Sequence, residues 1–116
     1  MVAMQLKLGD NYKPIDVHFV SPDMLNTQAK EHGVYNENEQ VEGLWVPNNH
    51  CIYVSNNPKV NTAEFIFMHE LIHCIDDLTD MHEEENKVDA KANLLLAFIR
   101  ENNFVLRKII SKELHK

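Results

Sequence analysis

The sequence predicts a small α+β domain of the zincin-like kind, in which a short, mostly antiparallel sheet packs on a central helix and further helices follow. Three observations predict this fold class. The first half of the chain carries strand-like patterns, an apolar helical segment occupies residues 62–78, and two more helical segments come after it. A chain of 116 residues with 44% hydrophobic residues can form one core, so we expect a single domain over residues 1–116.

The first half of the chain predicts a strand, a helix and a hairpin. Residues 14–20, PIDVHFV, alternate apolar with polar side chains, which is the period of a half-buried strand. Ser21 fits a helix N-cap before Pro22, and Gly33 fits a helix stop, so a helix is expected over residues 22–32. Two β-rich runs separated by PNN in GLWVPNNHCIYVS predict the hairpin.

The second half of the chain is expected to be helical. Asn61 or Thr62 can cap a helix over residues 62–78, and apolar side chains surround most of its circumference, so this helix should be central. A second helix is expected over residues 84–101. Its unbroken apolar run LLLAFI predicts that it also packs inside. The segment FVLRKIISKEL, residues 104–114, predicts a last short helix.

Composition and charge disfavour two classes of partner. The formal net charge is −7 and the sequence has no basic stripe, which argues against direct binding of nucleic acid. No stretch approaches the roughly 20 apolar residues of a membrane span, and the first residues lack the apolar run of a signal peptide. We therefore expect a cytoplasmic protein without a membrane partner. Cys51 and Cys74 lie in apolar stretches, which favours buried free thiols.

The segment FIFMHELIHCIDD, residues 65–77, carries the strongest functional signal. His69, Glu70 and His73 form H-E-x-x-H, and on a helix the two histidines lie about 40° apart, one turn above the other. Both imidazoles can therefore reach one metal ion. Glu70 lies about 100° around from His69, so its carboxylate can take a proton from a metal-activated water. The alternative, a pair of hydrogen-bonded core histidines, buries polar groups at high cost.

A catalytic zinc site usually has a third protein ligand and one open position. Asp89 begins the buried part of the next predicted helix, from which an acid can complete the site, and we predict it as the third ligand. Glu85, one helical turn earlier, remains an alternative, as do His82 and Asp77. For His82 the sequence lacks a required glycine, because Asp76 stands where H-E-x-x-H-x-x-G-x-x-H has one. Two imidazoles with one carboxylate make Zn²⁺ the expected ion.

The strand CIYVS, the helix NTAEFIFMHELIH and the later DAKANLLLAFI together resemble the ImmA/IrrE-type zinc metallopeptidases, a gluzincin-like group of small α+β zincins. The resemblance covers residues 15–99. It implies that His69 and His73 bind zinc and that Glu70 is the catalytic glutamate. It also implies that the third ligand is an acid just before an AN-containing helix, for which Asp89 in DAKAN is the nearest match.

The chain departs from this family in three respects. Ile72 stands where glycine is usual, the link between the two motifs is short, and the acid is aspartate instead of glutamate. Aspartate reaches one methylene less, so either the second helix approaches more closely or Glu85 serves instead. The resemblance implies an intracellular peptidase, often encoded by phages or mobile elements, that acts on a regulatory protein such as a repressor.

The predicted function is therefore that of a zinc-dependent HExxH endopeptidase, which hydrolyses peptide bonds of a protein substrate with Glu70 as general base. An extended substrate is expected to pair with the strand at residues 50–55, and Tyr53, His50 and His82 are candidates for stabilising the oxyanion. The alternative is a non-catalytic zinc-binding regulatory or interaction module. The presence of Glu70 argues against this alternative, because metal ligation alone does not require that residue.

Overall fold

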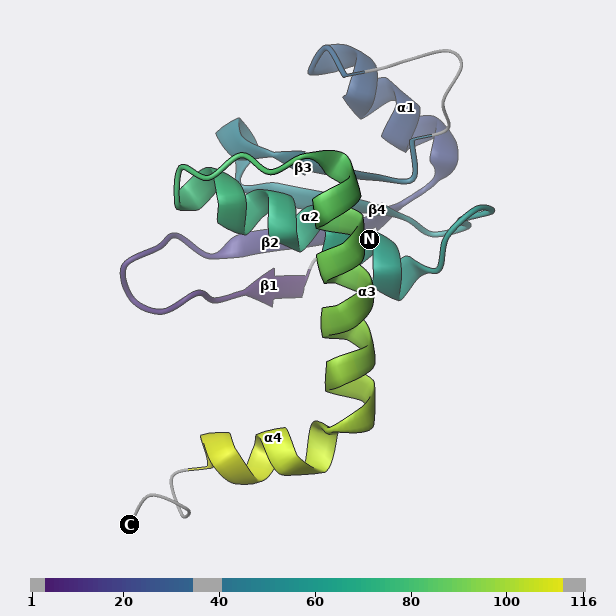
Figure 1. The fold of residues 1–116 in the computed structure, drawn as a ribbon. Coiled ribbons are helices and arrows are strands. Elements are labelled where there is room, and N and C mark those ends of the chain that lie inside the picture. Colours follow the sequence, from purple (N-terminus) through teal and green to yellow (C-terminus); the bar gives the residue numbers. More distant parts are fainter. Residues whose placement is uncertain (1–3, 35–40, 112–116) are drawn as a thin grey trace.

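In the computed structural model, which describes residues 4–34 and 41–111, these ranges form an α+β arrangement of four strands and four α-helices (Figure 1). In chain order the elements are β1 (Met4–Leu6), β2 (Ile15–Val20), α1 (Pro22–Glu31), β3 (Gly43–Val46), the 3-10 turn η1 (Pro47–Asn49), β4 (Cys51–Ser55), α2 (Ala63–Leu78), α3 (Glu85–Glu101) and α4 (Asn103–Ile110). Residues 112–114 of the last predicted helix lie outside the described ranges.

The four strands form one mixed sheet in the order β1-β2-β4-β3. The pairings β1–β2 and β3–β4 are antiparallel, as predicted for most of the sheet, whereas the central β2–β4 pairing is parallel. β1 was not predicted. Because β4 lies between β2 and β3, it has no free edge, and the expectation that a substrate pairs with residues 50–55 is wrong. β3 is an edge strand of the described sheet and packs beside α2, and β1 forms the opposite edge.

The two faces of the sheet pack against different helices. One face presents Ile15 and Val17 of β2 and Ile52 of β4, which form the main core with Ile66 and other side chains of α2. The other face presents side chains of β2 and β3 that pack around a leucine of α1: Val20, Leu44, Val46 and Leu25. α1 and α2 therefore cover opposite faces, as the two-residue period of a strand requires.

The predicted starts of α1 and α2 are confirmed by their caps. The Ser21 hydroxyl accepts the backbone N–H of Met24 at 3.2 Å, and Pro22 follows as the first helical residue. Thr62, one of the two candidates, caps α2 by accepting the N–H of Phe65 at 3.2 Å. Each cap satisfies an N–H group that has no partner inside its helix.

The prediction that the LLLAFI run of α3 packs inside is wrong. Val88 and Ala92 are the buried residues of α3. They pack on α2, but Leu94 is 72% exposed and Phe98 49%. The physical reason is that α3 runs past the start of α2, where no other described element covers it, and α4 follows at its far end (Figure 1). None of the described helices has both the length and the apolar character that crossing a membrane requires.

Glu42 connects the approach to α2 with the start of β3. Its carboxylate accepts the backbone N–H groups of Lys59, Val60 and Asn61, at 2.6, 3.1 and 3.0 Å. Its own carbonyl accepts the N–H of Ser55 at 2.9 Å. Burial of the side chain raises the pKa of Glu42, but the three backbone hydrogen bonds outweigh burial and hold this pKa below its ordinary value. The ionised carboxylate is thus the form that stabilises the fold.

Replacing Glu42 by glutamine should lower the free energy of unfolding at pH 7 by about 1–3 kcal/mol, because three hydrogen bonds lose their charged acceptor. Since the pKa of Glu42 is lower in the folded state, its contribution is fully present above the ordinary value of 4.5. The contribution is lost as the pH falls through the folded value. Urea unfolding at a series of pH values should therefore show the difference between wild type and variant shrinking in acid.

The matched control for this prediction is Glu64→Gln, which changes an exposed glutamate of α2 that pairs with Arg100 on the surface. It should change the free energy of unfolding by less than about 1 kcal/mol at every pH. A Glu42→Gln loss no larger than that of the control, or one that grows in acid, would contradict the role of Glu42.

Candidate metal centre

α2 places the two histidines of the motif on successive turns of one face. The Nε2 atoms of His69 and His73 lie 3.1 Å apart, and the ring centroids are separated by 4.7 Å. The side chains are 16% and 27% exposed, so the rings are partly shielded from solvent. The spacing of four residues thus directs two imidazole nitrogens toward one point, as a shared metal ion requires.

Glu85, the first residue of α3, brings its carboxylate to both rings. One carboxylate oxygen lies 3.0 Å from His69 Nε2 and the other 3.0 Å from His73 Nε2. A tight turn between the helices makes this approach possible: Asp80 has a positive φ of 56°, and the N–H of Met81 bonds the Asp76 carbonyl at 2.7 Å. The start of α3 also suits a negative charge, because a helix N-terminus carries partial positive charge.

Asp89, the ligand predicted from the sequence, contacts the other nitrogen of the ring. Its Oδ1 lies 2.7 Å from His69 Nδ1, on the side of the imidazole away from His73. The longer side chain of Glu85, one turn earlier on α3, takes the place expected for Asp89. Among the described residues, the His/Cys/Asp/Glu group that converges here is His69, His73 and Glu85.

Asp76, Asp77 and His82 do not join the ligand group at the Nε2 atoms of His69 and His73. Asp77 accepts the indole N–H of Trp45 at 3.2 Å, so the alternative that it completes the metal site finds no support. His82 is 71% exposed, and its Nε2 lies 3.5 Å from Asp80. Asp76 is buried, and its Oδ2 has no hydrogen-bond partner in the parts of the chain that are described. Neither His82 nor Asp77 therefore joins the group of His69, His73 and Glu85.

The arrangement of donors and acceptors fits a bound cation. When His69 donates its Nδ1–H to Asp89, its Nε2 carries a lone pair that faces Glu85 and His73. The Nε2 atom of His73 carries at most one hydrogen, so it can donate to only one of its neighbours. Each remaining contact in this group then joins two lone pairs. A zinc ion at 2.0–2.1 Å from each ligand would place ligand atoms about 3.3 Å apart, close to the separations seen here. A carboxylate that accepts the second N–H of the ring, as Asp89 does for His69, is the usual partner of a zinc-binding histidine.

Glu70 lies between α2 and β3, where the strand leaves room for it. A Cβ atom on Gly43 would lie 3.0 Å from Glu70 Cγ and would overlap Ile66, so the close approach needs glycine. Burial raises the pKa of Glu70 to about 8, the negative charge of Glu85 adds to this rise, and a hydrogen bond from the Trp45 backbone opposes it. Nothing in the sequence pattern had assigned a role to Gly43.

These side chains line an open cleft of about 640 Å³ between β3, α2 and the start of α3. The polar residues of the lining are His69, Glu70, His73, Glu85, Asp89, Glu42 and Asn61. Gly43 and apolar side chains complete it: Val34, Val41, Leu44, Val60, Phe65 and Ile66. The cleft therefore offers an apolar surface beside a cluster of metal ligands, which is the usual composition of a binding site for an organic substrate.

Comparisons with family models, curated proteins and solved structures gave no match. The likeness of the motifs to ImmA/IrrE-type peptidases therefore stays a prediction.

Alanine at Glu85 should weaken zinc binding more than alanine at Asp89. Loss of a direct ligand is expected to cost more than about 100-fold in affinity, whereas loss of an outer carboxylate costs about 10–100-fold. Competition with a chromophoric chelator measures both values. Glu84→Ala is the matched control, because Glu84 neighbours the site but makes no side-chain cap for α3. Affinity that falls further in Asp89→Ala than in Glu85→Ala would make Asp89 the ligand, as the sequence had predicted.

Proposed function

We propose that this chain is a zinc-dependent metallopeptidase that hydrolyses peptide bonds of a protein substrate. The observation that carries the proposal is the convergence of His69 Nε2, His73 Nε2 and the Glu85 carboxylate, all within about 3 Å of one another, in the wall of an open cleft. Glu70 lines the same cleft. Two imidazoles, one carboxylate and an adjacent second carboxylate are the residues that zinc-dependent hydrolysis of a peptide uses.

His69, His73 and Glu85 would hold the ion, and Asp89 would keep His69 in the tautomer that leaves Nε2 free to bind. When bound, Zn²⁺ supplies a Lewis acid that lowers the pKa of water toward 7 and polarises a carbonyl oxygen. With three protein ligands, the ion would keep a position for solvent, as in catalytic zinc sites. Asp89 thus acts on the orientation of the ring, and Glu85 acts on the ion itself.

Glu70 would serve as the proton carrier. Burial and the negative charge of Glu85 raise the pKa of Glu70, and a cation held by Glu85 would offset that charge and so favour the ionised form of Glu70. The carboxylate would then take the proton of the attacking water and deliver it to the amine that leaves when the peptide bond breaks. The hydrogen bond from the Trp45 backbone fixes the direction of the carboxylate, and Gly43 lets β3 approach it closely. Metal ligation needs none of these features, which favours a hydrolase over a non-catalytic zinc module.

The free edge of β3 is the place that we propose for the substrate backbone. Glu42, Gly43 and Leu44 line the cleft at the start of this strand, and an extended peptide can pair with an exposed edge through main-chain hydrogen bonds. The Trp45 N–H is already bonded to Glu70, so a peptide would use the Gly43 end of the strand. The resemblance of the motifs supports an intracellular regulatory protein, such as a repressor, as the substrate.

Replacing Glu70 by glutamine should lower kcat/KM for peptide cleavage by at least about 100-fold, because the amide cannot carry the proton. The zinc content should stay unchanged, since Glu70 is not among the converging ligand atoms. Zinc is measured by elemental analysis, and cleavage is assayed with a broad peptide library and mass spectrometry. Glu64→Gln makes the same chemical change on the exposed face of α2 and should keep full activity.

Two results would count against the peptidase. Zinc in wild type and in both variants with cleavage by none of them would support the alternative of a non-catalytic zinc-binding module. Cleavage by Glu70→Gln at the rate of wild type would exclude Glu70 as the proton carrier.

A further inference from the structure

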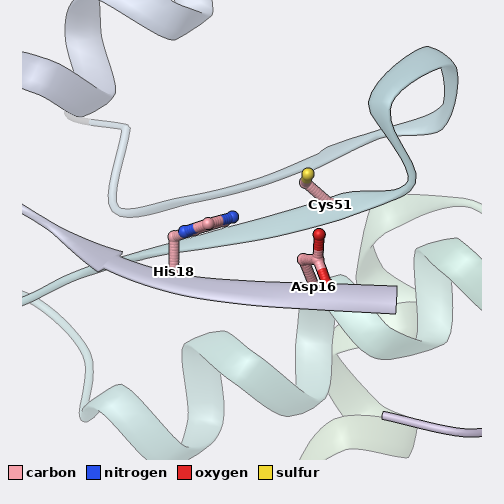
Figure 2. A group of neighbouring side chains, drawn as sticks. All are labelled: Asp16, His18 and Cys51. Atoms are coloured by element: carbon pink, nitrogen blue, oxygen red, sulfur yellow. The ribbon is translucent and has the colours of Figure 1, made fainter. Parts of the chain in front are cut away.

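A second group of ligand-type side chains lies on the other face of the sheet. Asp16 and His18 are two residues apart on β2, so both project from the same face. Cys51 of β4 is the parallel register partner of Asp16 and projects beside it. Figure 2 shows the three side chains on one side of the β2–β4 pair, with Asp16 directed toward Cys51. Ile15 and Val17 alternate with them and face α2, so the sheet separates this group from the HExxH centre.

The ligand atoms of Asp16, His18 and Cys51 all lie within 4.8 Å of one another. A tetrahedral zinc site with Zn–S near 2.3 Å and Zn–N near 2.0–2.1 Å needs ligand atoms about 3.3–3.8 Å apart. A bound ion would therefore require small rotations of these side chains. The backbone positions are firmly held, because β2 is paired on both sides by β1 and β4, and β4 is paired by β2 and β3.

Neighbouring side chains hold two of the three residues in place, as residues around a metal site commonly do for the ligands. The Gln5 amide donates to Asp16 Oδ1 at 3.1 Å, which fixes the carboxylate and leaves its other oxygen without that bond. The imidazole of His18 stacks on Tyr53, with ring centroids 5.4 Å apart. Cys51 is buried, whereas Asp16 and His18 are half-buried, so the group is open toward solvent on one side.

A reactive cysteine explains this group less well than a metal site does. Burial raises the pKa of the Cys51 thiol, and the negative charge of Asp16 adds to that rise, while Lys13 opposes it. The thiol donates to the Asn49 carbonyl at 3.1 Å. A protonated, buried thiol is a poor nucleophile. A divalent cation would displace its proton to solvent and neutralise the charge of the thiolate and of the carboxylate.

We propose that Asp16, His18 and Cys51 form a second divalent-cation site, distinct from the HExxH centre. Thiolate and imidazole ligands favour Zn²⁺, or Co²⁺ as its probe, over Mg²⁺ and Ca²⁺, which prefer oxygen. The ion would join β2 to β4, the parallel pair at the centre of the sheet, with solvent in the fourth position. Its binding therefore stabilises the folded chain, as any ligand of the folded state does.

The test isolates this site from the first one. CoCl₂ is titrated into the metal-free full chain carrying His69→Ala and His73→Ala, and the near-ultraviolet charge-transfer band from thiolate to cobalt is recorded. The band should appear and saturate at one equivalent, because Cys51 is the thiol of the proposed ligand set. Adding Cys51→Ala should abolish it. Adding Cys74→Ala is the matched control and should leave it, because Cys74 is a residue of α2 that is buried in the main core, on the opposite face of the sheet.

Two further variants keep Cys51 in place, so a folding defect at that position cannot decide the result. His18→Ala should weaken cobalt binding more than about tenfold, and Gln5→Ala about tenfold, through loss of a ligand and of its outer support. Zinc should raise the thermal midpoint of the His69→Ala/His73→Ala chain, and this rise should disappear when His18→Ala is added. The site is overturned if no band forms, if the band survives Cys51→Ala, or if His18→Ala leaves the affinity and the midpoint shift unchanged.

Discussion

The contact between the first turns of α3 and the histidine face of α2 is the constraint on which the candidate site depends. Val88 and Ala92 are fully buried against α2, and this packing sets how far the start of α3 lies from the two imidazoles. Two carboxylates one turn apart on α3 then meet two imidazoles one turn apart on α2: Glu85, Asp89, His69 and His73. The equal spacing on both helices lets one carboxylate reach the metal position while the other orients a ring.

This contact also concentrates negative charge in a small volume. Glu70, Glu85 and Asp89 line one cleft in a chain whose formal net charge is −7, and no lysine or arginine lines that cleft among the described residues. Carboxylates that face one another and imidazole lone pairs are unfavourable unless a shared cation, or a proton on an imidazole, offsets their charge. In the proposed function a divalent ion meets this requirement, because His69, His73 and Glu85 form a group that could hold one.

The sequence predicts the features that depend on neighbouring residues, and it fails for those that depend on contacts between distant segments. The starts of α1 and α2 and the β3–β4 hairpin follow from local caps and turns, and the H-E-x-x-H spacing predicts that the rings of His69 and His73 lie together, as they do in the structure. Which acid of α3 lies beside both Nε2 atoms, Glu85 or Asp89, depends on the relative position of α2 and α3, and no local sequence pattern gives that position. The short β1 and the parallel β2–β4 pairing depend on contacts between distant segments, and so does the proximity of Cys51 to Asp16.

The most direct test is an anomalous difference map at the zinc absorption edge, from crystals of the protein grown with zinc. The account predicts a peak between α2 and α3, about 2.0–2.2 Å from the Nε2 atoms of His69 and His73 and from a Glu85 oxygen. Asp89 should remain on the Nδ1 side of His69. A peak that Asp89 ligates while Glu85 turns to solvent, or no peak between these helices, would contradict it.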